Sequence, residues 1–493
     1  MIILSALNAR YIHSSLGLRY LYANMGELQA QTQIMEFMIK QRPIDIAEAL
    51  LEQKPSVIGF GCYIWNITET TAVIAILKAL QPQLRIVLGG PEVSYETELS
   101  PALPYADVII RGQADLHFAT LCRELLTGKP VIERIVDAPA ISPTELTLPY
   151  PFYNDEDIRQ RVIYVEASRG CPFKCEFCLS SLDKTAQAFE LDEFLGEMER
   201  LYQRGARHFK FVDRTFNLNL KTSARILRFF LGKPLHDLFL HFELIPDRLP
   251  EGLKDLIQQF PTGSLQFEIG IQSFNPEVQQ LISRKQDHHK TLENLRFLRQ
   301  QTAVHLHTDL IAGLPGEDMQ SFARGFDLLV SLQPHEIQVG ILKRLRGTPI
   351  IRHSEAFEMV YNPNPPYNIL STRDMDSATL FRISRFARYW DMIANSGRFQ
   401  QSLPLLLQQR PFTHFMEWSD WLFKRTGQTH QIALPRLFRL LYEFCERTDF
   451  RQGLEEDFKR SGIKNSFADV VKDSSAKQKS VPSASSRQLR HQL

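Results

Sequence analysis

The feature that most constrains the fold is a regular alternation of short apolar runs with helical patterns, which occurs twice along the 493 residues. Strands that are separated by helices predict βαβ units and a parallel sheet, so the first part is expected to have a Rossmann-like α/β fold. Glycines follow these strands, at the edge where such sheets bind ligands. The apolar runs of this first part, residues 1–138, are Met1–Leu4, Val57–Gly61, Ile86–Leu88 and Val108–Ile110.

The second alternation occupies residues 161–348 and contains six candidate strands. Six strand–helix units are too few for a closed eight-stranded barrel, so we expect a partial (β/α)6 barrel of the TIM type. The candidate strands are Val162–Ala167, His208–Val212, Phe239–Glu243, Leu265–Gln272, Val304–Ile311 and Ile337–Leu342.

The remaining segments differ in composition from these two parts. Residues 139–160 contain four prolines and are predicted to be a linker that runs over the surface. Residues 349–465 are rich in Leu, Phe, Arg and Trp at helical spacing, which predicts a helical C-terminal domain. Residues 466–493 contain few large apolar side chains and are predicted to form a disordered tail.

Charge and apolar segments exclude several classes of protein. Lys plus Arg is 57 and Asp plus Glu is 56, a balance that gives no electrostatic reason to expect a nucleic acid or an anionic membrane as partner. The N-terminus lacks the basic region of a signal peptide, and the apolar runs are too short to span a bilayer. We therefore expect a cytoplasmic protein, in which six cysteines do not form a disulfide framework.

Three of the cysteines lie in one short loop after a predicted strand, in the segment Arg-Gly-Cys171-Pro-Phe-Lys-Cys175-Glu-Phe-Cys178. Iron–sulfur clusters normally have four cysteine ligands, so three thiolates would leave one iron of a [4Fe–4S] cluster open. A structural zinc site would need four ligands, and no neighbouring Cys pair or His completes one. An open iron can chelate the amino and carboxylate groups of S-adenosylmethionine (SAM) and pass an electron into its sulfonium. Cys62, Cys122 and Cys445 are scattered and are expected to be small buried apolar residues.

This loop, with an aromatic residue before its last cysteine, resembles the signature of the radical SAM superfamily, and the resemblance extends over residues 160–345. Val212–Asn217 resembles the second-strand motif, although an aspartate replaces the glutamate found in many members. Phe267–Ser273 and Asp309–Glu317 resemble the fourth strand and the fifth strand with its adenine loop. An arginine fork could bind the methionine carboxylate. The SAM-binding residues that the resemblance implies are Phe177, Asp213, Glu268, Gln272, Ser273, Arg284, Gly313 and Gly316.

Residues 1–138 resemble a cobalamin-binding domain, in which glycines after the strands let a large ligand and its nucleotide tail approach the backbone. The Asp-x-His-x-x-Gly motif that often supplies a cobalt ligand is absent from the first loop, although His13 lies there. The resemblance thus implies cobalamin with its lower base removed and no protein histidine on cobalt. Tyr63 and Trp65 are expected either against the corrin or in the core. The implied cobalamin-binding residues are Asn8, Tyr11, His13, Gly61, Gly89, Gly90, Pro91, Glu92 and Gly112.

The combination resembles cobalamin-dependent radical SAM enzymes with an uncharacterised helical C-terminal domain. It implies cleavage of SAM to a 5′-deoxyadenosyl radical and methyl transfer to an unactivated carbon, with an electron donor such as flavodoxin or ferredoxin as partner. One alternative is a rearrangement, a cyclisation or a methylthiotransferase reaction, although a methylthiotransferase normally carries further N-terminal cysteines. A second alternative is a non-catalytic sensor of cobalamin or of an iron–sulfur cluster. The sequence indicates neither the substrate nor a catalytic side chain.

Overall fold

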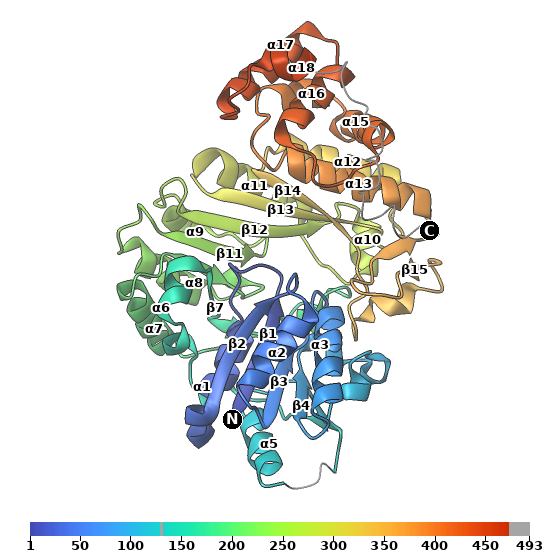
Figure 1. Cartoon of the computed structure of the whole chain (residues 1–493). Coiled ribbons are helices and arrows are strands. Elements are labelled where there is room, and N and C mark those ends of the chain that lie inside the picture. Colours follow the sequence, from blue (N-terminus) through green and yellow to red (C-terminus); the bar gives the residue numbers. More distant parts are fainter. Residues whose placement is uncertain (129–131, 473–493) are drawn as a thin grey trace, which may run out of the picture. The chain divides into compact units, whose positions relative to one another are not determined.

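The computed structural model describes residues 1–128 and 132–472, and the chain divides into two compact units. Met1–Leu380 forms the first unit, and the second begins at Phe381. Figure 1 shows that the first unit contains two sheets, one from the N-terminal part of the chain and one from its middle. No helix among the described residues is long and apolar enough to cross a membrane.

The N-terminal sheet has six parallel strands in the order β2-β1-β3-β4-β5-β6, which confirms the predicted α/β fold. Strand β2 lies on one side of β1, and β3 to β6 follow on the other side. This reversal of the strand order at β1 is the switch point of a doubly wound sheet. The prediction missed two edge strands, β2 and β6. The strands are β1 (Ile2–Asn8), β2 (Thr32–Met38), β3 (Val57–Gly61), β4 (Arg85–Gly89), β5 (Val108–Arg111) and β6 (Ile135–Asp137).

Helices cover both faces of this sheet, so successive residues of a central strand enter two different cores. In β1, Ile3 and Leu7 pack in one core, and Ile2 and Leu4 pack in the other. Helices α2 and α3 contribute to the first core and α1 and α5 to the second. The helices of this part are α1 (Leu16–Ala23), α2 (Pro43–Glu52), α3 (Ile67–Leu80), α4 (Pro91–Ser94) and α5 (His117–Leu126).

The second sheet also has six parallel strands, and they follow one another around it in the order β14-β13-β12-β11-β10-β7. This order is that of an open barrel, as the strand count predicted. Figure 1 shows these strands in green to yellow. They are β7 (Ile163–Val165), β10 (His208–Phe211), β11 (Phe239–Leu244), β12 (Leu265–Gln272), β13 (His305–Ala312) and β14 (Glu336–Ile341).

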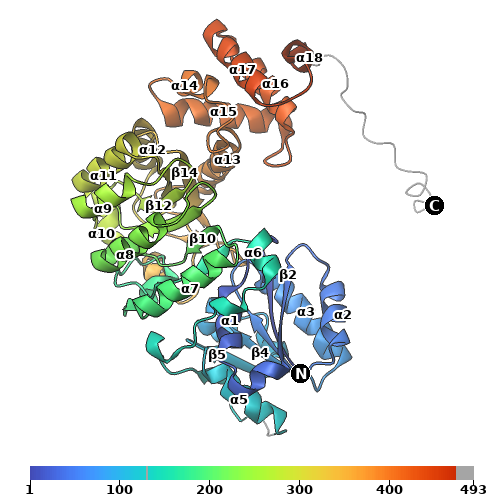
Figure 2. The same cartoon turned by 90° about the vertical axis from the view of Figure 1, so that its left-hand side faces the viewer.

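The helices between the barrel strands cover one face of the sheet (Figure 2). In β12 the apolar residues Leu265, Phe267, Ile269 and Ile271 are buried, whereas the residues between them are polar or glycine and only partly buried. The sheet therefore has an apolar outer face and a polar inner face. The main helices are α7 (Leu191–Gln203), α8 (Leu220–Leu231), α9 (Glu251–Ile257), α10 (Pro276–Leu281), α11 (His288–Gln301) and α12 (Met319–Ser331).

The segment between the two sheets is not the surface linker that its prolines predicted. Tyr150 and Tyr153 are fully buried in it, and their hydroxyls donate to the carbonyls of Glu166 (3.0 Å) and Tyr164 (2.7 Å). These hydrogen bonds remove the penalty of burying the hydroxyls, so the aromatic rings can pack against α1 on one side and α7 of the barrel on the other. The segment ends in a short helix, α6 (Asp155–Gln160).

The end of the chain is helical, as predicted, and Trp418 is fully buried in its core. The predicted tail is wrong in its first part, because a helix lies there; residues 473–493 lie outside the described residues. The helices are α13 (Ser377–Ile393), α14 (Ser402–Leu407), α15 (Pro411–Thr426), α16 (Leu434–Phe444), α17 (Thr448–Arg460) and α18 (Phe467–Lys472).

Candidate active site

The three clustered cysteines lie in a loop that a short antiparallel pair closes at its base, β8 (Ser168–Arg169) with β9 (Gln187–Ala188). The backbone N–H of Cys171 donates to the carbonyl of Asp183 at 2.9 Å. The Ser181 hydroxyl lies 2.9 Å and 2.7 Å from the carbonyl oxygens of the other two cysteines. The loop is thus held by its own hydrogen bonds rather than by a regular element.

All three cysteines line one cavity of about 260 Å³. Burial raises the pKa of Cys171 and of Cys175. At Cys175, Arg284 opposes this rise, because its Nη1 lies 3.5 Å from the sulfur. Among the described residues no three potential ligands converge tightly enough for a single metal ion. Thiols spread around one cavity suit a cluster, because its irons occupy several positions.

Glu176, between the last two cysteines, anchors the loop to the rest of the barrel. Its side chain is buried, and its carboxylate accepts hydrogen bonds from Ser283 (2.5 Å) and His353 (2.9 Å) and pairs with Arg352. Its backbone N–H donates to the carbonyl of Ile282 at 3.1 Å. The cluster loop is therefore fixed to segments more than a hundred residues away.

Carboxylates from three neighbouring strands form the wall of the cavity beside the cysteines. They are Glu243 of β11, Glu268 of β12 and Asp309 of β13. Burial raises the pKa of Glu243 to about 7, although Arg214 lies only 2.6 Å away and opposes the rise. Burial acts in the same direction on Glu268, but the hydrogen bond from His241 and the charge of Lys210 lower its pKa to about 2. The wall therefore combines one firmly ionised carboxylate with one that titrates near neutral pH.

Four of the eight predicted SAM-binding residues line this cavity, namely Phe177, Glu268, Gln272 and Arg284. Gln272 has a positive φ of 70°, and its side-chain oxygen is buried without a protein partner among the described residues. A buried acceptor without a partner is costly, so it favours a ligand or water at this position.

The other four predicted residues make contacts within the protein. Asp213 accepts hydrogen bonds from the Ala167 N–H (2.9 Å) and the Ser168 hydroxyl (2.6 Å), and burial raises its pKa to about 6. Ser273 donates to the Glu317 carboxylate at 2.6 Å.

Gly313 and Gly316 pack against neighbouring side chains and do not line the cavity. Both have positive φ, of 85° and 77°. An added Cβ would lie 2.5 Å from Ile369 at the first position and 2.9 Å from Leu281 at the second. Close packing thus explains both glycines.

Sequence reasoning missed Arg214, Glu243 and Asp309, which line the cavity. Arg214 directly follows Asp213 and lines the cavity, whereas Asp213 does not, because neighbouring side chains of an extended segment point in opposite directions. Glu243 and Asp309 were inside predicted strands, and their polar character within alternating apolar runs was the available signal.

The predicted cobalamin-binding residues gather at the carboxyl edge of the N-terminal sheet. Gly61 and Gly89 end β3 and β4, and Gly112 follows β5. Gly90 has a φ of 106°, and a Cβ there would lie 2.5 Å from the carbonyl oxygen of Cys62. Protein backbone, and not ligand space, therefore requires glycine at position 90.

Several of the other predicted residues hold this edge in place. Asn8 donates to Glu36 and to the His13 carbonyl, both at 2.9 Å. Glu92 is buried and pairs with Arg346 at 2.9 Å, and it also accepts a hydrogen bond from Tyr367. Pro91 is the first residue of α4, directly before this glutamate.

Large apolar side chains remain exposed on the loops of the same edge. The loop after β1 exposes Tyr11 (38%) and Ile12 (43%), and the loop after β3 exposes Trp65 (49%). The Tyr11 hydroxyl donates to Glu156 and lies 3.0 Å from Gln160, and Trp65 stacks on Tyr63 with ring centroids 4.4 Å apart. Exposed apolar groups at a ligand-binding edge suit a large planar ligand such as a corrin.

Loops of this edge contact the barrel directly. His13 Nδ1 lies 2.7 Å from the hydroxyl of Tyr164 on β7, and burial and the charge of Lys210 lower the pKa of His13. Asp115, after β5, pairs with Arg169 at 3.2 Å. Ligands at the two sheets would therefore lie in one continuous region of the first unit.

Comparisons with known proteins agree with this arrangement. Residues 165–329 match the family model of the radical SAM superfamily. Residues 3–121 match the model of the B12 binding domain. Residues 355–492 match a model described as a protein of unknown function, DUF4080.

Two curated relatives are methyltransferases. The chain is 25% identical over 344 residues to 2-(S-pantetheinyl)-carbapenam-3-carboxylate methyltransferase of Streptantibioticus cattleyicolor, covering 60% of this chain and 48% of the relative. It is 25% identical over 369 residues to the cobalamin-dependent radical SAM methyltransferase TokK of Streptomyces tokunonensis, covering 66% and 53%. The chain thus spans about half the length of these relatives.

A solved structure shares the fold over nearly the whole chain. The cobalamin-dependent S-adenosylmethionine radical enzyme OxsB, with aqua-cobalamin and S-adenosylmethionine bound, aligns with a TM-score of 0.62 at 13% identity. The alignment covers 96% of this chain and 83% of OxsB. The two proteins therefore share their fold over this alignment.

Proposed function

We propose that this chain, a radical SAM protein with an N-terminal B12-binding domain and a C-terminal domain of unknown function, is a cobalamin-dependent methyltransferase that acts on an unactivated carbon. The observation that carries the proposal is that the three cysteine thiols and polar residues of the barrel strands line the same cavity. The two relatives named above are methyltransferases, which supports this choice.

The chemistry of the cavity matches the groups that SAM carries. Arg284 offers a planar fork for the methionine carboxylate. Glu243 and Asp309 can accept from an ammonium group and from ribose hydroxyls, and the unpartnered oxygen of Gln272 can accept one further hydrogen bond. When bound, the cluster supplies the electron that cleaves SAM to a 5′-deoxyadenosyl radical, and cobalamin supplies the methyl group.

The protein's own part is to hold these groups and to exclude water. Burial of Cys171 and Cys175 shields the cluster position from solvent. The carboxyl edge of the N-terminal sheet supplies apolar contacts for the corrin through Trp65 and Tyr11. An electron donor such as flavodoxin or ferredoxin remains the expected partner.

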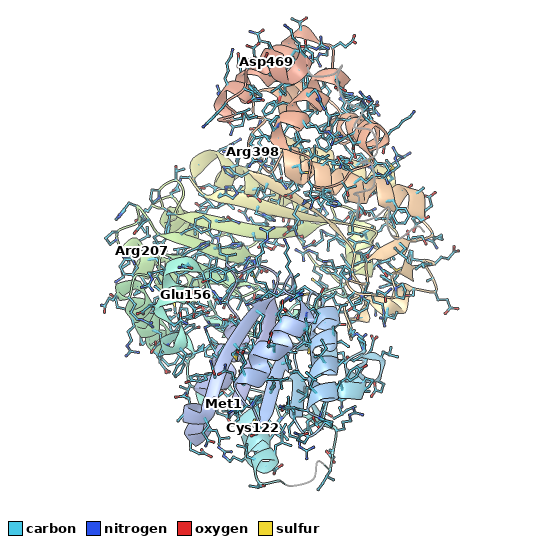
Figure 3. The ribbon with its side chains drawn as sticks, viewed as in Figure 1. Met1, Cys122, Glu156, Arg207, Arg398 and Asp469 are labelled. Carbon is cyan, nitrogen blue, oxygen red and sulfur yellow. The ribbon has the colours of Figure 1, made fainter. Side chains whose placement is uncertain are left out.

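A methylthiotransferase reaction is less well supported, because it would need further cysteines for a second cluster. Cys62 and Cys122 are both fully buried. Burial raises the pKa of Cys122 to about 12 and raises that of Cys62 as well, so neither forms a thiolate readily. Cys122 lies on α5, where it is labelled in Figure 3, and packs in the apolar core.

Anaerobic reconstitution with iron, sulfide and hydroxocobalamin tests the proposal. We expect about four irons per chain, a corrinoid that stays bound through gel filtration, and 5′-deoxyadenosine after addition of SAM and dithionite. SAM with an isotope-labelled methyl group, added to extract of a strain that lacks this protein, should label a product only when the enzyme is supplied. Cluster-loaded protein that makes no 5′-deoxyadenosine would contradict the radical step, and absence of a labelled product would contradict methyl transfer.

A further inference from the structure

The inner face of the barrel carries a row of polar side chains where a closed barrel would have a packed apolar core. In TIM barrels the interior is filled mainly by branched apolar residues. Here one polar residue from each of five neighbouring strands stands in register, nearer the amino ends of the strands than the carboxylates of the cysteine cavity. The row consists of Tyr164, Lys210, His241, Gln266 and His305.

Lys210, in this row, has an ammonium group with unused hydrogen-bonding capacity. The carboxylate nearest to it is Glu268, at 3.6 Å, and that oxygen already accepts a hydrogen bond from His241 at 2.9 Å. Within the described residues Lys210 donates no hydrogen bond to protein, although an ammonium has three donors. Its side chain is 29% exposed, so a ligand in the barrel could reach it.

Three histidines surround this ammonium. Burial lowers the pKa of His13, His208 and His241, and the positive charge of Lys210 lowers each of them further. The imidazoles are therefore neutral at pH 7, and each has one N–H. His241 donates its N–H to Glu268, so the N–H donors that an anion could use belong to His13 and His208. A lysine among neutral imidazoles is a set of donors that suits an anion.

The other charged groups of the inner face are already paired. His307 lies between Asp309 (3.2 Å) and Glu336 (3.0 Å), and Glu336 also contacts His305 at 2.8 Å. Arg214 pairs with a glutamate of β11, as described above. Lys210 differs from these paired groups because, within the described residues, it donates no hydrogen bond to protein and its one ion-pair contact, to Glu268, is 3.6 Å long.

We propose that Lys210 binds an anionic group of the substrate, a carboxylate or a phosphate, on the inner face of the barrel. The inference rests on the proposed function and adds the chemical class of the substrate to it. His13, from the loop after β1, would contribute a neutral N–H donor, whereas the N–H of His241 is taken by Glu268. Glu268 is the nearest competing anion, and the carboxylates of Glu243 and Asp309 also interact with the same ammonium.

Histidine signals report on this site without any need for turnover. An anion beside neutral imidazoles favours their charged form, so it should raise their pKa values by about 1. In the full-length chain, purified without air and labelled at histidine Cε1, NMR titrations would be run with inorganic phosphate and, separately, with acetate. We expect saturable shifts of the His13, His208 and His241 signals with one of these anions, which identifies the group.

Variants make the result specific to this lysine. Lys210→Met should abolish the shifts, whereas Lys254→Met, a lysine on α9 that pairs with Glu251 at 2.8 Å, should leave them unchanged. Glu268→Gln removes the competing charge and should tighten anion binding, measured on the His13 and His208 signals. Far-ultraviolet circular dichroism checks that each variant is folded.

Two outcomes would overturn the proposal. One is the absence of saturable shifts with both anions, and the other is an unchanged response in folded Lys210→Met protein. The experiment uses neither SAM nor a reductant, so a negative result leaves the proposed SAM cleavage intact. Equally, a protein that binds the anion but fails to cleave SAM would contradict the proposed function and not this site.

Discussion

The two parallel sheets of the first unit have the same number of strands, but they bury their faces differently. Strand β1 of the N-terminal sheet is buried at six successive positions, whereas β12 of the barrel alternates buried with partly exposed residues. Helices cover both faces of the first sheet and only the outer face of the second. The first sheet can therefore bind a ligand only at its edge, and the barrel can bind ligands at its edge and across its inner face.

This difference is already visible in the two strand sequences. Ile2–Asn8 reads IILSALN, a nearly continuous apolar run, and Leu265–Gln272 reads LQFEIGIQ, with strict alternation. Continuous runs are typical of strands that are buried on both faces, and alternation is typical of strands with one polar face. If the two sheets bind their ligands separately, a change that damages one site should leave the other intact.

The largest effect is expected from Cys175→Ala. Removal of one of three cluster ligands should abolish the cluster absorbance and the formation of 5′-deoxyadenosine completely. Corrinoid binding should persist, because its residues lie at the edge of the other sheet. Absorbance spectra before and after gel filtration, together with chromatography of the nucleoside, measure both properties.

Cys445→Ala is the matched control, because this half-buried cysteine ends α16, in the second unit. It should keep cluster and corrinoid alike. Loss of corrinoid together with the cluster in Cys175→Ala would show that the two sheets do not bind independently.

A smaller effect is expected from shortening a core side chain. Leu4 is fully buried in β1, so Leu4→Ala should lower the free energy of unfolding by about 2–5 kcal/mol. Gln266→Ala, on the inner face of the barrel, should change it by less than about 1 kcal/mol, because no apolar packing is lost. Urea denaturation followed by fluorescence compares the two, and equal losses would contradict the distinction between the faces.

Gly90→Ala should lower the free energy of unfolding by less than Leu4→Ala does. It should lower it by more than the replacement of a glycine whose Cβ position has no neighbouring atoms. A Cβ at Gly90 would clash with the backbone of Cys62, whereas Gly263, with a φ of 83°, has no atom within 4 Å of its Cβ position. Gly263→Ala should cost about 1 kcal/mol from backbone strain alone. Gly90→Ala should cost about 1–3 kcal/mol more. If Gly90→Ala and Gly263→Ala had equal unfolding midpoints in urea, the backbone of Cys62 would be able to move aside without a measurable loss of stability.

A separate effect is expected from the pH dependence of the barrel. The two flanking carboxylates outweigh burial and raise the pKa of His307 to about 10, from an ordinary value of 6.5. Because the folded pKa lies above the unfolded one, this stabilisation is complete below pH 6.5 and is lost as the pH rises to about 10. We expect His307→Asn to be less stable than the wild type at pH 6, with a difference that shrinks by about 1 kcal/mol per pH unit above neutrality. A constant difference between the two melting curves would contradict this.

Strands and helices could be predicted from the sequence where the pattern of apolar residues lies within the element itself. Val57–Gly61 was predicted with the bounds that it has, because five apolar or glycine residues between helices indicate a buried strand. The edge strand Thr32–Met38 was missed because its residues are mostly half-exposed and the apolar pattern is weak. The burial of Tyr150 and Tyr153 was missed because it depends on hydrogen-bond acceptors in another segment.

The residues of the candidate site could likewise be predicted only where the signal lies in a short stretch of sequence. The cysteines share one loop, so their sequence spacing alone brought them together. The choice between Asp213 and Arg214 depended on Ala167 and Ser168, whose N–H and hydroxyl groups turn the aspartate away from the cavity. No local pattern contains that information.

The anchoring of Glu176 sets a limit on how far the chain can be shortened. A truncated protein that ends after the last barrel strand, at residue 345, would keep every cysteine of the loop. It would lose Arg352 and His353, which pair with this buried carboxylate. An unpaired buried charge is strongly destabilising, so the cluster loop would be the first part of the shortened protein to unfold. Attempts to isolate a minimal radical SAM core should therefore retain the chain at least through residue 353.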